Sequence, residues 1–244
     1  MQSTPPIAAA DRAALRPRTM VPSWALKVTM AVSGLTWLAF VLVHLVGNLK
    51  VYAGASAFNA YAAWLREVLV PLAPHGGVLW ALRVVLAVLL VAHVWAAAIL
   101  TARARSARGP HRARLHSWRS FVASTMPVTG LVILGFIVLH LLDLTLGVQP
   151  VAPSAFRAEG SGAFFAHENL VASLSRPWSA AVYILTMLLL AGHVLHGTTV
   201  AVQDLGGMGR TLRAGATWVG AILAVAILLG NAGIPIAVLL GVVT

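Results

Sequence analysis

Residues 33–45 read SGLTWLAFVLVHL, and residues 129–141 read TGLVILGFIVLHL. The two stretches align without a gap, and each carries a small polar residue and a glycine at its start and a histidine near its end. A weaker pair, LLVAHV at residues 89–94 and LLAGHV at residues 189–194, again has histidine at one shared position. Histidine is rare in segments this apolar, so the shared register favours a duplicated two-helix unit over coincidence. Equivalent helices would run in the same direction, which makes this a parallel repeat about an axis along the membrane normal.

The composition surrounding these stretches excludes an ordinary soluble domain. The chain has 244 residues, of which 59% are hydrophobic and 9% charged, and its mean hydropathy is +0.88. Soluble domains carry about 25% charged residues. The chain contains no cysteine, so it cannot form disulfides, thiolate zinc sites or cysteine-held iron–sulfur clusters by itself. Any metal must therefore rest on histidine, methionine or carboxylate side chains.

Five stretches are long and apolar enough to cross a bilayer, which requires roughly 20 residues at 1.5 Å each. They lie at about 24–48, 78–101, 121–146, 178–202 and 215–241. Their apolar runs are continuous, unlike the short alternating segments of a β-barrel. The sequence therefore predicts an all-α membrane protein with a five-helix transmembrane domain at residues 23–242. Residues 1–22, rich in proline and arginine, are expected to form a disordered cytoplasmic tail without a cleavable signal peptide.

The basic residues predict the orientation of these helices. Twelve of the 17 lysine and arginine residues fall before or at the start of the first stretch, between the second and third, or between the fourth and fifth. The other five, Lys50, Arg66, Arg83, Arg157 and Arg176, belong to the opposite side. The positive-inside rule then places the N-terminus in the cytoplasm and the C-terminus outside. The arginine-rich loop at 102–120 is interpreted as a topology signal and a contact for anionic lipid, compatible with a docking partner, rather than a nucleic-acid site.

The depths of four histidines indicate two pairs. His44 and His140 come about 19 to 20 residues into outward-running helices, near the outer surface. His93 and His193 lie roughly 12 to 14 Å from the cytoplasmic face in helices that run the other way. Two imidazoles at one level are too few for a tetrahedral zinc site, because Asp143 is the only acid nearby. They match the two axial positions of a haem iron, so two haem b groups are expected, one above the other.

Four further residues are candidates for haem binding. Gly34 and Gly130 lie near the depth of the inner histidine pair and would let a macrocycle approach the backbone, although small residues are also common in membrane helix packing. Arg83, in the outer half of the second helix, is expected to be buried and to pair with a propionate. His196 lies one turn beyond His193 on nearly the same face and leaves the choice of ligand open. The remaining histidines, at positions 75, 111, 116 and 167, are expected in solvated loops.

These motifs resemble a known family. The segments HLVGN at residues 44–48, TG to His140 at residues 129–140 and HVLHG at residues 193–197, followed by Leu205-Gly206, are similar to the dihaem cytochrome b558 membrane anchor of succinate dehydrogenase and fumarate reductase. The resemblance covers about residues 24–241. It implies that His44 and His140 hold the outer haem, that His93 and His193 hold the inner one, and that His193 is a ligand in preference to His196. Ala97 departs from the glycine of some relatives.

The resemblance also implies a mechanism and partners. Succinate would be oxidised at a separate flavoprotein subunit carrying FAD, and electrons would pass through an iron–sulfur subunit on the cytoplasmic side to the two haems and then to menaquinone. This chain would be a non-catalytic-head subunit of that succinate:quinone oxidoreductase of the tricarboxylic acid cycle, in a bacterial inner membrane. A quinone site near the outer haem could use Glu67, Arg83 or His75 for proton transfer, although Glu67 and His75 fit a solvated loop better.

Three other interpretations use the same histidines differently. A dihaem cytochrome b subunit of a hydrogenase or formate dehydrogenase also carries electrons through two haems but pairs its histidines in another way. A proton-coupled transporter would use them as a relay and bind no haem. A purely structural anchor would tolerate replacement of all four.

Overall fold

The computed structural model describes residues 21–108, 118–160 and 162–244. These residues form helices joined by turns, with one isolated bridge between Gly160 and Ala163 and no strand in the described part of the chain. In chain order the elements are α2 (Ser23–Asn48), the short helix η1 (Leu49–Ala53), α3 (Ala55–Glu67), α4 (Gly77–Arg108), α5 (Trp118–His140), the π-helical turn η2 (Leu141–Leu146), α6 (Ala166–Leu174), α7 (Pro177–Asp204) and α8 (Arg210–Leu239). The expected tail falls almost wholly outside the described residues.

Five helices in the described ranges are long and apolar enough to cross a membrane, as the sequence predicts: α2, α4, α5 continued by η2, α7 and α8. Two of them extend past the expected apolar run, because α4 continues to Arg108 and α8 already begins at Arg210. Alanine and arginine are strong helix formers, so a helix continues after its apolar residues end. The third span is built differently, because α5 ends at His140 and the π-helical turn η2 continues the span to Leu146. Gly147, with φ at +66°, ends η2.

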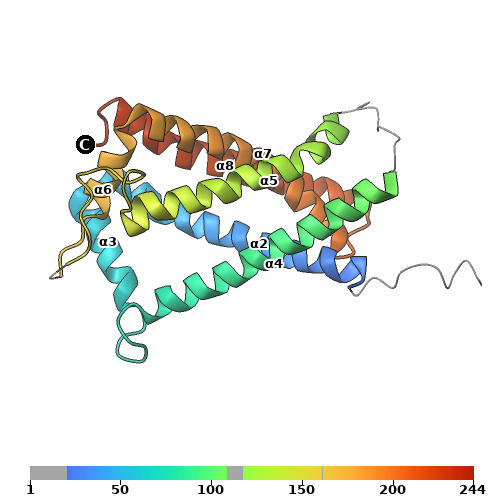
Figure 1. Ribbon diagram of the computed structural model, residues 1–244, viewed down its shortest axis with the longest axis horizontal. Coiled ribbons are helices and arrows are strands. Elements are labelled where there is room, and N and C mark those ends of the chain that lie inside the picture. Colours follow the sequence, from blue (N-terminus) through green and yellow to red (C-terminus); the bar gives the residue numbers. More distant parts are fainter. Residues whose placement is uncertain (1–20, 109–117, 161) are drawn as a thin grey trace, which may run out of the picture.

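The ends of the bundle differ in construction (Figure 1). The start of α2 lies with the ends of α4 and α7, where Lys27 pairs with Asp204 at 3.1 Å and Arg103 donates to the Ser23 hydroxyl at 2.9 Å. The opposite end carries η1, α3, α6 and the C-terminus. Because the described chain crosses the bundle five times, the start of α2 and the C-terminus lie at opposite ends.

The linkers at that second end contain two short helices that apolar runs alone did not predict. Within this layer α3 packs against α6. Asn59 of α3 accepts from the backbone N–H of His167 at 2.9 Å and donates to Glu168 at 2.9 Å. Partial burial raises the pKa of Glu168, but this hydrogen bond and the nearby His167 and Arg157 charges outweigh it and hold the pKa below its usual value. His167 is buried beside Phe58, which corrects the expectation of a solvated loop.

Among the spans, α7 is central. It packs against α8, α2 and α5, and α2 in turn packs against α4. Within the described residues, neither α2 and α5 nor α4 and α7 are among the helix pairs that pack closely. These four helices therefore form a ring in the order α4, α2, α7, α5, since α5 also contacts α4. In this ring α2 lies diagonally opposite α5, and α4 lies diagonally opposite α7.

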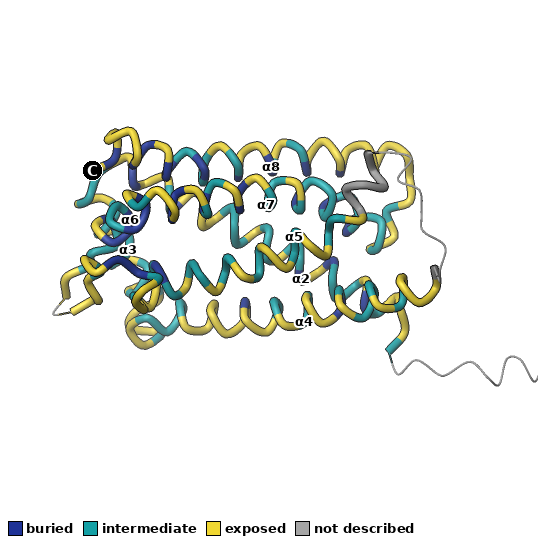
Figure 2. The backbone as a smooth tube through the Cα atoms, turned by 45° about the horizontal axis from the view of Figure 1, so that its top comes forward, coloured by how far each residue is buried: buried dark blue, intermediate teal, exposed yellow. Residues whose placement is uncertain are grey.

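The outer faces of the helices remain apolar and unpacked, as Figure 2 shows for most of α4 and one side of α8. On α4 the exposed residues include Val88 and Val91, at 62% and 69% of their full accessible surface. On α8 they include Trp218 and Leu229, at 73% and 69%. Apolar faces of this extent need lipid or another protein against them.

Candidate functional site

The structure brings His44 of α2 and His140 of α5 together near the end of the bundle that carries α3 and α6. Their ring centroids lie 6.0 Å apart, with the ring planes at 78°. Each ring stacks on the phenylalanine one turn before it: Phe40 at 5.4 Å from His44, and Phe136 at 5.8 Å from His140. Because α2 and α5 do not pack closely, the two rings meet across the diagonal of the bundle.

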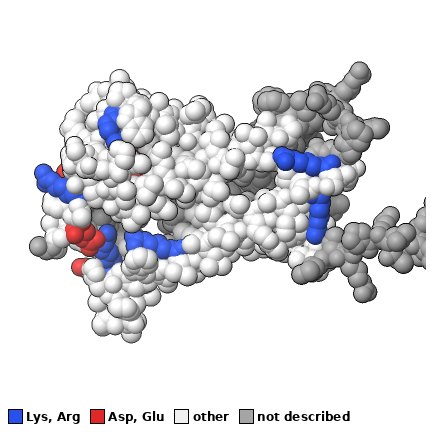
Figure 3. All heavy atoms as spheres, in the orientation of Figure 1, with Lys and Arg blue, Asp and Glu red and all other residues white. Residues whose placement is uncertain are grey.

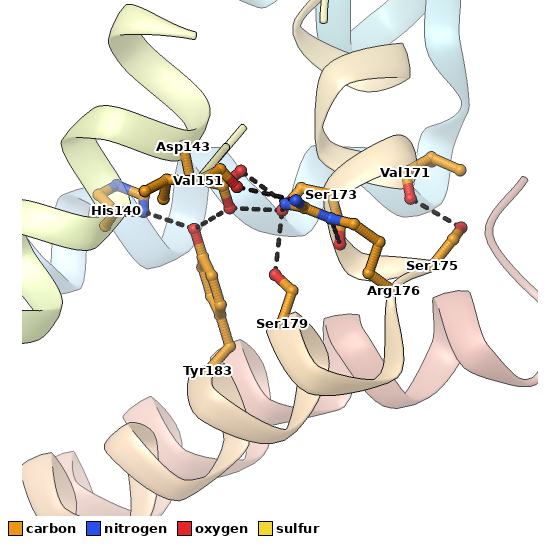
Figure 4. Close-up of polar contacts among 9 residues, drawn as sticks. All are labelled: His140, Asp143, Val151, Val171, Ser173, Ser175, Arg176, Ser179 and Tyr183. Atoms are coloured by element: carbon orange, nitrogen blue, oxygen red, sulfur yellow. Dashed lines mark hydrogen bonds and ion pairs between the residues drawn. The ribbon is translucent and has the colours of Figure 1, made fainter. Parts of the chain in front are cut away.

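The ring of His140 is held from its Nδ1 side, as Figure 4 shows. That nitrogen lies 3.3 Å from the hydroxyl of Tyr183 on α7, and the same hydroxyl donates to Asp143 at 3.1 Å. A tyrosine hydroxyl has one proton, so its oxygen must accept from the His140 Nδ1–H. The lone pair of His140 is therefore on Nε2.

His93 of α4 has the same tautomer for a different reason. Its Nδ1 lies 3.1 Å from the carbonyl of Met30 and 3.0 Å from the hydroxyl of Ser33, both on α2. A carbonyl only accepts, and Ser33 already donates to the carbonyl of Thr29 at 2.6 Å. Nδ1 of His93 must then carry the proton, which leaves Nε2 with the lone pair.

His193 of α7 repeats this arrangement on the other half of the bundle. Its Nδ1 lies 3.2 Å from the hydroxyl of Thr129 on α5, and Thr129 donates to the carbonyl of Met126 at 3.1 Å. A hydroxyl can donate or accept, so this contact holds Nδ1 of His193 without deciding which ring nitrogen carries the proton. Ser33 and Thr129 occupy equivalent positions in the two aligned stretches, so each histidine of this pair uses the small polar residue that opens the neighbouring stretch.

The two glycines lie beside these rings rather than beside open space. A Cβ added at Gly34 would lie 3.1 Å from Cε1 of His93, and one at Gly130 would lie 3.5 Å from Cε1 of His193. Glycine at these positions lets an imidazole of the adjacent helix lie against the backbone. The sequence placed these glycines near the depth of the inner histidines, and their contact with a macrocycle stays a prediction.

His93 and His193 are close enough for charges on their rings to interact, and the same holds for His193 and His196. For His44 and His196 no hydrogen bond from the ring is seen among the described residues, whereas the other three rings have a fixed Nδ1 partner. Within the described chain there is no group of three or more histidine, cysteine, aspartate or glutamate residues that could hold a metal ion. The donor set consists of pairs, which suits a metal whose other ligands come from elsewhere.

The separation of the outer pair suits one metal ion between two imidazoles. A metal to imidazole-nitrogen bond is about 2 Å long, so two rings on opposite sides of one ion have centroids about 6 Å apart. Nitrogen ligands without their proton, oriented by a second hydrogen bond on the other ring nitrogen, are the usual form of metal-binding histidine.

No contact between Arg83 and either histidine pair is seen among the described residues. Arg83 is exposed instead of buried, and its guanidinium lies 4.9 Å above the ring of Trp80. It lines a cavity of about 200 Å³ together with His75, Arg66 and Glu159, the last two of which form an ion pair at 2.5 Å. His75 is thus in a loop, as expected, while Glu67 is exposed and does not line this cavity. His111 and His116 lie outside the described residues.

The sequence did not identify Tyr183 as a site residue, although a signal was present. Tyr183 precedes His193 by ten residues, as Arg83 precedes His93. The depth argument that selected Arg83 also places Tyr183 level with the outer histidines. What the argument lacked was the contact between α5 and α7, which brings this hydroxyl to His140 and Asp143.

Comparisons with family models, with curated proteins and with solved structures found no match for this chain.

Proposed function

We propose that this chain is the membrane anchor and electron-transfer subunit of a succinate:quinone oxidoreductase, with two b haems between a cytoplasmic iron–sulfur subunit and menaquinone. One observation carries the proposal: two histidine pairs in which a neighbouring helix holds Nδ1 of three rings, and in which His93 and His140 keep the proton on Nδ1 and present Nε2 as a free ligand. A transporter relay would not need this tautomer, because a relay passes protons through both ring nitrogens.

Haem suits these residues better than a bare ion. Each level offers two imidazoles, no cluster of three ligating side chains is seen in the described part of the chain, and a porphyrin would supply the remaining nitrogen ligands. Helices at diagonal positions hold the members of each pair, so the separation that a macrocycle requires is built into the packing. The equivalent contacts of His93 with Ser33 and of His193 with Thr129 support the duplicated two-helix unit as the origin of this arrangement.

In this proposal the chain's own residues bind the haems and orient the histidine rings that hold them. With both axial positions of each iron taken by imidazole, the haems would carry single electrons and leave no open position for oxygen. Ser33, Met30 and Thr129 fix the inner rings, while Tyr183 fixes one outer ring. The chain holds no flavin or dicarboxylate signature, so succinate oxidation belongs to the flavoprotein subunit with its FAD.

The distribution of charge supports the direction of docking. On the face shown in Figure 3, lysine and arginine side chains lie at both ends, whereas acidic side chains are seen at the end with α3 and α6, which leaves the end with the starts of α2 and α8 as the more basic one. In a bacterial inner membrane the basic end would face the cytoplasm and the iron–sulfur subunit. Menaquinone would then react at the end of the bundle that carries the outer pair, where Arg83 and His75 line a cavity beside α4.

A haem assay of the purified chain tests the proposal. We expect two low-spin haems per chain. His44→Ala and His140→Ala should each remove the same haem, and His93→Ala and His193→Ala should each remove the other. His196→Ala is the matched control on α7 and should keep both.

A colourless native protein would refute the proposal and favour the transporter. If His196→Ala loses the inner haem while His193→Ala keeps it, the ligand choice is wrong. Succinate added to native membranes should reduce both haems; reduction by hydrogen or formate alone would assign the chain to a hydrogenase or formate dehydrogenase instead.

A further inference from the structure

A buried carboxylate lies next to the outer site. Asp143, in η2, is fully buried, and its Oδ1 accepts from Arg176 at 2.9 Å. Its Oδ2 accepts from Tyr183 at 3.1 Å and from Ser173. Arg176 is in turn fixed by the carbonyl of Val151 at 2.8 Å. A carboxylate with this many donors is held in one orientation, and its charge is paired with Arg176.

This negative charge reaches His140 through a single hydroxyl. Figure 4 shows the Tyr183 oxygen between the His140 ring and Asp143, with Arg176 on the other side of the carboxylate. Because Tyr183 donates its proton to Asp143, its oxygen is more electron-rich toward the His140 Nδ1–H. An imidazole that donates to such an acceptor is a more basic metal ligand through Nε2.

The other three histidines lack this connection. Nδ1 of His93 contacts the neutral oxygens of Met30 and Ser33, and Nδ1 of His193 contacts the neutral hydroxyl of Thr129. At the positions of the aligned stretches that correspond to Asp143 and Tyr183, the first half of the chain has Gly47 and Arg83. No such acceptor of His44 is seen among the described residues, where His140 is the one ring of the four that a hydroxyl links to a carboxylate.

We propose that Tyr183 and Asp143 are positioning residues that lower the reduction potential of the outer haem by strengthening His140 as an electron donor. The inference rests on the proposed function. A more basic axial ligand stabilises the ferric form, so the ferric iron accepts its single electron less readily. Tyr183 and Asp143 thus give the two haems different reduction potentials, although two histidines hold each haem.

The test is a redox titration of the purified full-length chain carrying Tyr183→Phe. This change removes one hydroxyl and keeps the ring that packs against Phe136. We expect the ferrous to ferric ratio of the outer haem at a fixed potential to rise about tenfold, or about 59 mV for a one-electron couple. The inner haem should not change. Tyr52→Phe, the same substitution at an exposed tyrosine, is the matched control and should shift neither haem.

Low-temperature electron paramagnetic resonance gives a second readout, because the signal of a ferric haem with two imidazoles depends on their orientation and donor strength. Only the outer signal should change in Tyr183→Phe. An unchanged outer potential with both haems bound would overturn the inference, as would an equal shift of both haems. Asp143→Asn should raise the same potential; if that variant fails to assemble, Tyr183→Phe decides alone. A native protein without haem would refute the proposed function itself, whereas two haems and an inert Tyr183→Phe would refute only this inference.

Discussion

At the scale of single residues, two glycines in equivalent positions differ in how closely an imidazole approaches. At Gly34 an added methyl group would lie 3.1 Å from the His93 ring, closer than ordinary contact allows, whereas at Gly130 the distance to the His193 ring is 3.5 Å. The His93 ring cannot simply move away, because Met30 and Ser33 hold its other side. The two positions are therefore a natural matched pair.

We expect Gly34→Ala to weaken the inner haem and Gly130→Ala to leave it in place. Overpacking costs about 1 to 3 kcal/mol, which corresponds to roughly fivefold to a hundredfold weaker haem retention. The measurement is the inner-haem content of each purified variant after a chase with apomyoglobin as haem acceptor. Equal loss from both variants would mean that these glycines matter through the helix backbone rather than through the ring contact.

The four paired histidines could be placed from the sequence because depth follows from helical rise alone. Rise fixes height along the membrane normal, so it put His44 level with His140. It does not fix which neighbour a side chain meets at that height. For that reason the sequence found Arg83, which is exposed, and missed Tyr183, which contacts His140.

At the scale of elements, apolar length was sufficient to predict the five spans and too coarse for what connects them. The short helices α3 and α6 form in linkers of mixed polarity, where they are held by contacts with each other such as the Asn59 hydrogen bonds. The turn η2 depends on a tertiary contact too. It carries Asp143 into the buried network with Ser173 and Arg176, partners that lie some 30 residues later in the chain.

The closest helix packing in the bundle, between α7 and α8, depends on a small residue. A Cβ at Gly220 of α8 would lie 3.2 Å from the backbone carbonyl of Leu195 and 3.2 Å from Cβ of Thr198. A backbone atom cannot rotate out of the way, so a larger side chain must separate the helices. This use of glycine is common where membrane helices approach closely.

We expect Gly220→Leu to destabilise the protein by about 1 to 3 kcal/mol. That is a fall of several degrees in the midpoint of thermal unfolding in detergent, since about 1 kcal/mol shifts Tm by roughly 2 to 4 °C in a chain of this size. Gly215→Leu, also in α8, is the control, because nothing lies within 4 Å of an added Cβ there. If the control is equally destabilised, the effect comes from the new side chain on the helix and not from the contact with α7.

At the scale of the whole molecule, the two ends differ in how their charges are balanced. At the end with α3 and α6, Arg66 pairs with Glu159 and Arg176 pairs with Asp143. At the other end Lys27 pairs with Asp204, and Arg103 binds a serine hydroxyl and the backbone carbonyl of Val21 rather than an acid. Excess positive charge at one end is what the positive-inside rule requires of the cytoplasmic side.

This orientation predicts which single cysteines react from outside the cell. The native chain has no cysteine, so each introduced thiol is the only one present. Ser56 and Ser154 are exposed at the end with α3 and α6, while Ser106 and Thr211 are exposed near the basic end. In intact spheroplasts a membrane-impermeant maleimide should label Ser56→Cys and Ser154→Cys only. After the cells are broken it should label all four, because a polar reagent then reaches both faces. The native chain is the control for background labelling.

The opposite labelling pattern would put the basic end outside. An iron–sulfur subunit in the cytoplasm would then face the His44 and His140 pair first, so the order of electron transfer proposed above would have to be reversed.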